Sequence, residues 1–431
     1  MKKYDVAVIG GGFSGVAAAI SAARGGASVI LAEKSNCLGG AACNCLVNPF
    51  MCYWTFEDDD GCIAKKQLSD GIFNEILEEM KKLEYEIDGK TYGENQPVGT
   101  FHEEYLKLAL NRMAKNAGVD LLFHANLVAS ECESGAVKSV TLSGKSGTFK
   151  LEARYFIDAS GDADLAFLSG FGYRLGRDAD NLCQPMTLCF RLSNIDIDKF
   201  HSLPQGYINN LYNKFQDEGK IKNPRENVLM FSNYLNGVIH FNSTRIVKLN
   251  PTDPFDLTKA EIEAREQVFE LFLFMKRNIP GFENCELMMT APEIGVRESR
   301  MIEGEYTLTG GDLLNLTKFD DAIAYGRYSI DIHSPDGTGT YLHHFKKDEY
   351  YSIPYRCSVP KGAENLLVAG RSISADHTAQ SAIRVMPIVC CIGEGVGTAA
   401  AMAAKDSIPV SGVSTAELRR ILKENGAFIE N

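Results

Sequence analysis

The sequence predicts an α/β fold with a parallel sheet, and a second α+β unit inserted between the two parts of the chain that build this sheet. Residues 4–9 are a short, β-branched apolar run, which is typical of a buried parallel strand. A glycine turn, a helical stretch of small residues and a second apolar run at 28–34 follow, so the chain opens with a strand–helix–strand unit. The same texture returns as an apolar run at 365–370 and a small-residue helix at 393–405.

These patterns also divide the chain. We predict a first, discontinuous domain from residues 1–170 and 336–410, a second domain from 171–335, and a peripheral helix in 411–431. Residues 50–100 interrupt the strand–helix alternation and are interpreted as an insertion on the side of the second domain. Within this frame we expect helices near 69–83, 101–118 and 258–278, strands across 120–142 around a turn at Ser134-Gly135, and a buried strand within 154–170.

Composition excludes several classes of protein. The net charge of -12 argues against a nucleic-acid partner, which needs a basic face. No uncharged apolar run reaches the roughly 20 residues that span a bilayer. The two lysines near the N-terminus mimic a secretory signal, but Asp5 and the following glycines break that pattern. Twelve cysteines in 431 residues are too sparse for a disulfide scaffold and indicate reduced thiols, so we expect a cytoplasmic protein.

The first glycine turn has the spacing Gly10-x-Gly12-x-x-Gly15, after a strand and at the start of a helix. In that setting the three glycines give a tight turn, a close approach of the main chain to a pyrophosphate, and close helix–strand packing. The helix N-terminus adds free N–H groups and partial positive charge. Glu33, at the end of the next strand, would bind ribose hydroxyls and repel a 2′-phosphate. These features favour a Rossmann-type dinucleotide site over a purely structural turn.

Three further segments distinguish between dinucleotides: SNCLGGAAC at 35–43, FIDASGDADL at 156–165, and residues 366–400. With them the chain resembles the FAD-dependent oxidoreductases of the glutathione-reductase-like superfamily, and more narrowly a bacterial group of FAD-dependent oxidoreductases. The resemblance covers residues 4–45, 154–166, 292–309 and 353–405, and it implies that FAD binds without a covalent link.

The resemblance implies a set of cofactor contacts. The 159–161 turn would border the pyrophosphate, residues 370–371 the pyrophosphate or ribityl chain, and residues 381–386 the isoalloxazine ring. A helix starting near Met386 would direct its N-terminus at the flavin N1/C2 region and stabilise a reduced anionic ring. Arg384 either adds charge there or pairs with a structural carboxylate. The expected cofactor residues are Gly10, Gly12, Phe13, Ser14, Gly15, Glu33, Lys34, Gly39, Gly40, Ala41, Ala42, Val128, Ala159, Ser160, Gly161, Gly370, Arg371, Ser381, Arg384, Val385 and Met386.

Two chemistries are disfavoured. A second nucleotide fingerprint for NAD(P)H is missing, because Gly170-x-Gly172 lacks the next glycine and a following acidic residue. Electrons would therefore come from the substrate or an external partner. Cys43 and Cys45 are separated by one residue, whereas disulfide reductases of the superfamily separate their redox pair by four. Cys37, Cys52 and Cys62 form no Cys-x-x-Cys pair with them, so buried thiols are favoured over redox, metal or flavin-linking roles and no metal is predicted.

Candidate catalytic residues come from two segments. Residues 292–309 resemble a family strand whose arginines approach the flavin; in a regular strand Arg297 and Arg300 face opposite sides, so at most one reaches the site. Such an arginine suits a carboxylate or an oxygen-rich substrate, or else forms a structural ion pair. His333 is the candidate base, with His377 as a second candidate, although a lone histidine is often structural. Further candidates, before the last nucleotide strand, are Tyr355 and Arg356.

The resulting functional prediction is an FAD-dependent oxidoreductase that transfers hydride between a small alcohol, polyol or carboxylic acid and flavin N5. Two alternatives stay open at this point: a flavin-dependent elimination or isomerisation without net redox change, and a non-catalytic FAD subunit that carries electrons. The sequence identifies neither the substrate, nor the electron acceptor or donor, nor the oligomeric state.

Overall fold

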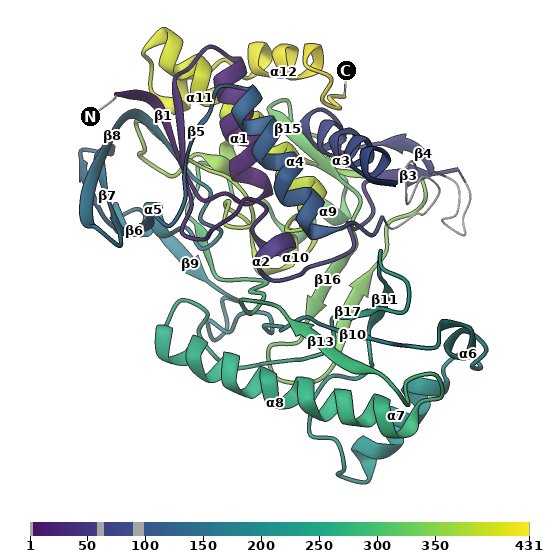
Figure 1. Cartoon of the computed structure of the whole chain (residues 1–431). Helices are drawn as coiled ribbons and strands as arrows, with labels where there is room; N and C mark the ends of the chain where they lie inside the picture. Colours follow the sequence, from purple (N-terminus) through teal and green to yellow (C-terminus); the bar gives the residue numbers. More distant parts are fainter. Residues whose placement is uncertain (1–2, 58–63, 89–98, 431) are drawn as a thin grey trace.

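The computed structural model describes residues 3–57, 64–88 and 99–430. Figure 1 shows an upper body, where the purple start and the yellow end of the chain lie together, and a lower body built from the teal and green middle. The predicted α/β fold class, with a mostly parallel sheet and an additional domain, is confirmed.

The sheet of the upper body has a parallel core around the first strand. β1 (Tyr4–Ile9) lies between β2 (Val29–Ala32) and β8 (Gly147–Asp158), and both pair with it in parallel. The last residues of β8 also pair in parallel with β19 (Leu366–Val368), while its first half is antiparallel to β7. The remaining strands are β5 (Asp120–Leu122), β6 (Asn126–Glu133) and β7 (Ala136–Gly144), the last two joined by the predicted turn at Ser134-Gly135.

Two helices from opposite ends of the chain pack against each other beside this sheet. α1 (Phe13–Arg24) crosses α11 (Met386–Asp406) at such close range that a Cβ on Gly393 would collide with the carbonyl oxygen of Ser14. α11 starts seven residues before the predicted 393, because the apolar residues continue upstream and a proline stands in its first turn. Among the described helices, only α11 is long and apolar enough to cross a membrane, and 94% of its apolar window is buried inside the protein.

α11 also anchors the next helix layer through a buried carboxylate. Glu394 is 3% exposed, and its Oε2 accepts the backbone N–H of Ile72 at 3.1 Å, at the start of α3 (Ile72–Asp88). Burial raises the pKa of Glu394 to about 8. α4 (Glu103–Asn116) lies beside α3, and the predicted peripheral helix is α12 (Thr415–Glu424).

The lower body is an antiparallel sheet covered by one long helix. Its strand order is β11–β12–β10–β13, and α8 (Pro254–Asn278) packs on one face (Figure 1). α8 starts four residues before the predicted 258, because the Asp253 side chain caps its first turn. The strands are β10 (Phe190–Ser193), β11 (Met230–Ser232), β12 (Ile239–Phe241) and β13 (Glu286–Thr290), with α6 (Ile197–His201) and α7 (Tyr207–Asp217) beside them.

The hydrophobic cores place the two bodies differently from the predicted domain limits. Apart from Leu46, the fully buried residues of the lower core run from Met186 to Ile294, whereas residues 302–353 contribute to the upper core. The predicted strand at 292–309 is also shorter, since only β14 (Arg300–Ile302) pairs with β9 (Tyr173–Leu175). The hairpin of β16 (Ile330–His333) and β17 (Thr340–His343) reaches from the upper body toward the lower one (Figure 1).

Candidate active site

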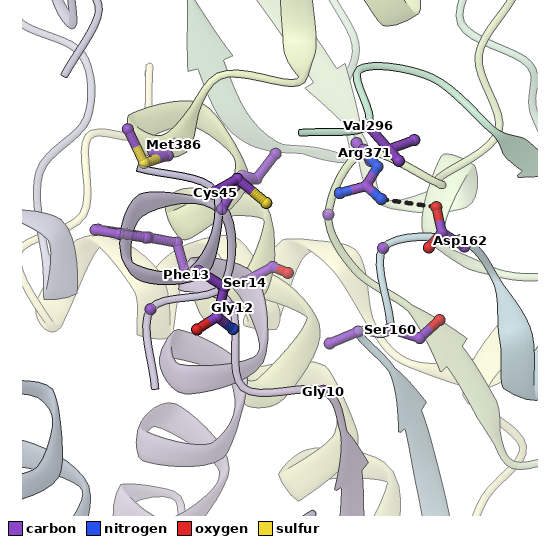
Figure 2. A pocket seen from close by; sticks show the side chains of 18 of the residues that line it. Gly10, Gly12, Phe13, Ser14, Cys45, Ser160, Asp162, Val296, Arg371 and Met386 are labelled. Carbon is purple, nitrogen blue, oxygen red and sulfur yellow. Dashed lines mark hydrogen bonds and ion pairs between the residues drawn. The ribbon is translucent and has the colours of Figure 1, made fainter. Parts of the chain in front are cut away.

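A cavity of about 170 Å³ lies where four turns of the upper body meet (Figure 2). These turns follow β1, β2, β8 and β19, the carboxyl ends of parallel strands, where α/β sheets bind their ligands. The expected cofactor residues that line this cavity are Gly10, Gly12, Phe13, Ser14, Glu33, Lys34, Gly39, Gly40, Ala41, Ala159, Ser160, Gly161, Gly370, Arg371, Arg384 and Met386.

The first turn gives this cavity a main-chain wall. A Cβ on Gly15 would collide with the Gly10 carbonyl oxygen, so Gly15 keeps α1 close to the strand and lies behind the wall rather than on it. At Gly12 the nearest atom to an added Cβ would be the Gly40 Cα, 3.9 Å away, so a side chain there would stand in the cavity. No side chain caps the N-terminus of α1. This cradle fits a diphosphate.

Glu33 stands at the cavity with both carboxylate oxygens engaged. Its Oε2 accepts the N–H of Gly11 at 2.5 Å, and its Oε1 accepts the N–H and hydroxyl of Ser35 at 2.8 and 2.9 Å. These bonds fix the carboxylate in place, and Oε2, which accepts only one of them, keeps a lone pair for a ribose hydroxyl.

Arg371 forms the opposite wall and carries an unsatisfied donor. Its Nη2 donates to Asp162 Oδ1 at 2.6 Å, the contact drawn in Figure 2, and Ser299 donates to the same oxygen. Within the described residues the buried Nε of Arg371 has no hydrogen-bond partner. A phosphate or ribityl oxygen in the cavity would satisfy that donor, so the side chains as well as the glycines fit FAD.

Neither Cys43 nor Cys45 forms a disulfide. The Cys43 thiol faces the Glu103 carbonyl at 3.9 Å, and the Cys45 thiol faces the Ile294 carbonyl at 3.6 Å. Burial raises the pKa of Cys45 to about 12, so it stays a neutral thiol. Among the described residues no three His, Cys, Asp or Glu side chains are grouped to hold a metal; Cys62 lies outside them.

A second cavity, of about 640 Å³, adjoins the first between the two bodies. Five residues line both cavities: Ala41, Val296, Arg371, Arg384 and Met386. Its walls come from the β16–β17 hairpin, from lower-body residues in and next to the strands of the lower sheet, and from residues 47–51. Of the remaining predicted residues, Arg297, His333 and Val385 line it.

Arg297 is buried in the wall and held by neutral acceptors. Its guanidinium donates to the Pro185 carbonyl at 2.7 Å, to Thr187 Oγ1 at 2.5 Å and to Asn242 Oδ1 at 3.3 Å. Burial, and then the positive charges of Arg384 and Arg225, lower the pKa of Arg297 to about 9.

His333 belongs to a hydrogen-bonded network rather than standing alone. Its Nδ1 faces the Arg245 guanidinium at 3.1 Å, and an arginine only donates, so Nδ1 must accept. Its Nε2 then carries the proton and faces Asp331 Oδ2 at 3.4 Å. Burial and the charge of Arg297 lower the pKa of His333 to about 3, which keeps the ring neutral. Tyr328 donates to the same Asp331 oxygen at 2.8 Å.

A family model described as FAD dependent oxidoreductase matches residues 5–422. The chain belongs to this family. It is therefore an FAD-dependent enzyme of the oxidoreductase class, and its cofactor is FAD. The wider glutathione-reductase-like superfamily stays a prediction.

No curated protein matches the chain. Solved structures with a similar fold include a geranylgeranyl bacteriochlorophyll reductase-like protein of Thermoplasma acidophilum (14% identity, 99% of this chain and 85% of that one, TM-score 0.47). Another is the p-nitrophenol 4-monooxygenase of Pseudomonas putida (11% identity, 99% of this chain and 84% of that one, TM-score 0.47). A third is the flavin-dependent brominase Bmp2 (11% identity, 98% of this chain and 83% of that one, TM-score 0.47).

Three predicted catalytic residues of this FAD-dependent oxidoreductase line neither cavity. Arg300 pairs with Asp164 at 2.9 Å and covers the Phe167 ring. Tyr355 opens a short 3-10 helix, and its buried hydroxyl donates to the Val410 carbonyl at 2.8 Å. Arg356 pairs with Asp321 at 2.9 Å. The structure thus places all three predicted catalytic residues outside both cavities, in ion-pair and packing contacts.

Other expected residues also lie elsewhere. Val128 is 41% exposed on β6, in the antiparallel extension of the sheet, and Ala42 is buried behind the cavity in α2 (Ala41–Asn44). Ser381 lies in α10 (His377–Ile383), where its hydroxyl accepts the N–H of Asp331 at 3.2 Å and so supports the hairpin. His377 starts the same helix and bonds Glu298 at 2.7 Å.

The structure adds residues that the sequence did not single out. Tyr328 and Asp331 line the larger cavity, and Arg225 and Glu226 enter it from a loop of the lower body. Asp331 stands two positions before His333 on one strand, so alternation could have placed both on one face. The loop carrying Arg225 has no comparable signal, because only the tertiary fold brings it to the cavity.

Proposed function

We propose that the enzyme transfers hydride between a small organic substrate (an alcohol, a polyol or a carboxylic acid) and N5 of FAD, with the substrate in the larger cavity. One observation supports this proposal: the cavity lined by the nucleotide turn shares five lining residues with a second cavity that is large enough for a small molecule. When bound, FAD supplies a two-electron acceptor or donor.

On the cofactor side, each residue has a role that follows from its position. We assign the diphosphate to the Gly10–Gly15 turn and the N-terminus of α1, and the ribose to Glu33. Arg371, fixed by Asp162, would donate to the middle of the cofactor. Met386 begins α11, so the positive end of this long helix faces the region where both cavities meet.

On the substrate side, we assign proton handling to Tyr328 and Asp331 instead of His333. An alcohol that loses hydride must also lose its hydroxyl proton to the wall. A substrate hydroxyl that donates to the Tyr328 oxygen would be one hydrogen bond from the Asp331 carboxylate, to which Tyr328 donates. His333 already accepts from Arg245 and donates to Asp331, so it serves as a positioning residue.

The expected partners are a small-molecule substrate and an external electron acceptor or donor, with neither nucleic acid nor membrane. The net charge of -12 and the reduced, mostly buried cysteines support a cytoplasmic location.

Anaerobic titration of the purified FAD-loaded protein tests this function. We expect at least one compound from a panel of alcohols, polyols and organic acids to bleach the visible flavin absorption, and turnover to require an added acceptor. Turnover without an acceptor would support the elimination or isomerisation alternative instead. A flavin that no compound in the panel bleaches, but that a protein donor reduces, would support the electron-carrying subunit.

A further inference from the structure

The charges around the larger cavity do not balance. Four arginines line it: Arg225, Arg297, Arg371 and Arg384. Two carboxylates, Glu226 and Asp331, line it as well, and His333 is neutral because burial lowers its pKa to about 3. Arg245, immediately behind the wall, adds a further positive charge through its contact with His333.

The carboxylates near the cavity are already engaged by other cations. Glu226 pairs with Arg245 at 3.0 Å, and Asp331 lies 3.4 Å from Arg384. Asp162, on the smaller cavity, pairs with Arg371 at 2.6 Å. Among the described residues, this leaves two cavity arginines, Arg225 and Arg297, without an acidic side chain in an ion pair.

Within the part of the chain that the structure describes, the Arg225 and Arg297 guanidinium groups donate hydrogen bonds to neutral groups only. Arg225 is 3% exposed, and its Nε donates to Asn227 Oδ1 at 3.2 Å. Arg297 donates to a carbonyl, a hydroxyl and an amide oxygen, as described above. Neutral acceptors orient a guanidinium but do not compensate its charge, and burying an uncompensated charge is costly. Such a pair is prepared for an anion that arrives with the ligand.

We propose that the substrate is an organic acid whose carboxylate binds between Arg225 and Arg297. This inference rests on the proposed function and narrows its substrate classes to hydroxy acids, because the proton path through Tyr328 needs a substrate hydroxyl. Apolar side chains line another part of the cavity: Val47, Pro49 and Met51 from the upper body, and Leu229 and Phe231 from the lower body. The acid should therefore have an apolar body, which these five side chains contact better than they would contact a polyol.

The test compares acids with their neutral amides on the FAD-loaded enzyme. Acetate, hexanoate and benzoate are each titrated beside acetamide, hexanamide and benzamide at constant ionic strength, with binding followed by the flavin spectrum and by calorimetry. We expect hexanoate or benzoate to bind at least tenfold more tightly than its amide, and acetate more weakly than both. If no acid binds more tightly than its amide, the inference is wrong.

Variants locate the effect. Arg297→Gln and Arg225→Gln should each reduce the acid-over-amide preference to threefold or less, because glutamine removes the charge that distinguishes the acid from its amide. The matched control is Arg265→Gln, an exposed arginine on α8 that pairs with Glu261, and it should leave the preference unchanged. Bound FAD and the circular dichroism spectrum show whether each variant is folded. If both glutamine variants still prefer acids over amides, the carboxylate does not bind between Arg225 and Arg297.

The experiments distinguish a failure of the hydride-transfer proposal from a failure of the carboxylate-binding proposal. Acids that bind through Arg297 but never alter the flavin redox state would sustain this inference and contradict hydride transfer. Bleaching by a neutral polyol, without any preference for acids, would do the reverse.

Discussion

The two cavities of this enzyme are built by different means. The cofactor cavity is lined mainly by four turns, at 10–14, 33–45, 159–162 and 370–371, whose glycines expose the main chain, with residues 293–296 and 384–389 beside them. Apart from the residues that it shares with the cofactor cavity and Val385, the substrate cavity is lined by five separate stretches, at 47–51, 187–189, 225–242, 295–297 and 328–344. A main-chain wall depends on conformations that few residues can adopt, so it leaves glycines at fixed spacings. A side-chain wall constrains no spacing at all.

The largest expected effect tests the main-chain wall directly. Gly12→Val should raise the FAD dissociation constant by 100-fold or more, because the new side chain stands in the cavity where a diphosphate would lie. The unfolding midpoint of the FAD-free protein should change little, since beyond the neighbouring residues the nearest atom to the added Cβ is the Gly40 Cα, 3.9 Å away. Gly99→Ala, which meets no atom within 4 Å, is the control and should bind FAD normally. Normal FAD affinity in Gly12→Val would contradict the assignment of the diphosphate to the Gly10–Gly15 turn.

A substitution in the substrate cavity should change the rate of flavin reduction rather than the affinity for FAD. Tyr328→Phe removes the hydroxyl that donates to Asp331, so we expect the rate of flavin reduction by substrate to fall about 100-fold. Rapid-mixing absorbance measures this rate, and the FAD dissociation constant of the same variant should stay within twofold. If the flavin of Tyr328→Phe is reduced at the wild-type rate, Tyr328 does not take part in proton transfer.

A buried carboxylate outside both cavities gives a pH effect. The folded-state pKa of Glu394 is raised to about 8, above its unfolded value of 4.5, so the native state holds a proton that the unfolded state releases in this window. Stability from this group is complete below pH 4.5 and is lost as the pH rises to 8, by roughly 1 kcal/mol per pH unit. The free energy of unfolding of Glu394→Gln, measured with denaturant, should therefore rise relative to that of the wild type as the pH rises. If the difference in unfolding free energy between the two proteins stays constant from pH 5 to 8, the raised pKa of Glu394 is contradicted.

The smallest effect concerns His333. Because burial lowers its pKa to about 3, the ring does not titrate between pH 5 and 8. His333→Gln should lower kcat a few-fold, through a less well-oriented Asp331, and leave the pH profile of kcat/KM unchanged in that range. Loss of an inflection near neutral pH in this variant would restore His333 as the base.

The same contrast explains what the sequence could predict. Gly10, Gly12 and Glu33 were found because the strand, turn and helix around them are consecutive, and the structure places all three at one cavity. The sequence allowed at most one of Arg297 and Arg300 to reach the site, and the structure places Arg297 there. The sequence could not show which of the two, since only residues 300–302 of the 292–309 segment form a strand. Arg225 gave no signal, since nothing in its own loop differs from an ordinary surface segment until the lower sheet brings it to the cavity.

The meeting of α1 and α11 has a consequence for how the protein matures. The nucleotide turn is synthesised well before Gly370, Arg371 and Met386, which close its cavity. A growing chain therefore exposes an incomplete dinucleotide cradle until these later residues leave the ribosome and fold against the turn. We expect tight FAD binding only from that stage onward, so a chain truncated before Gly370 should bind FAD weakly.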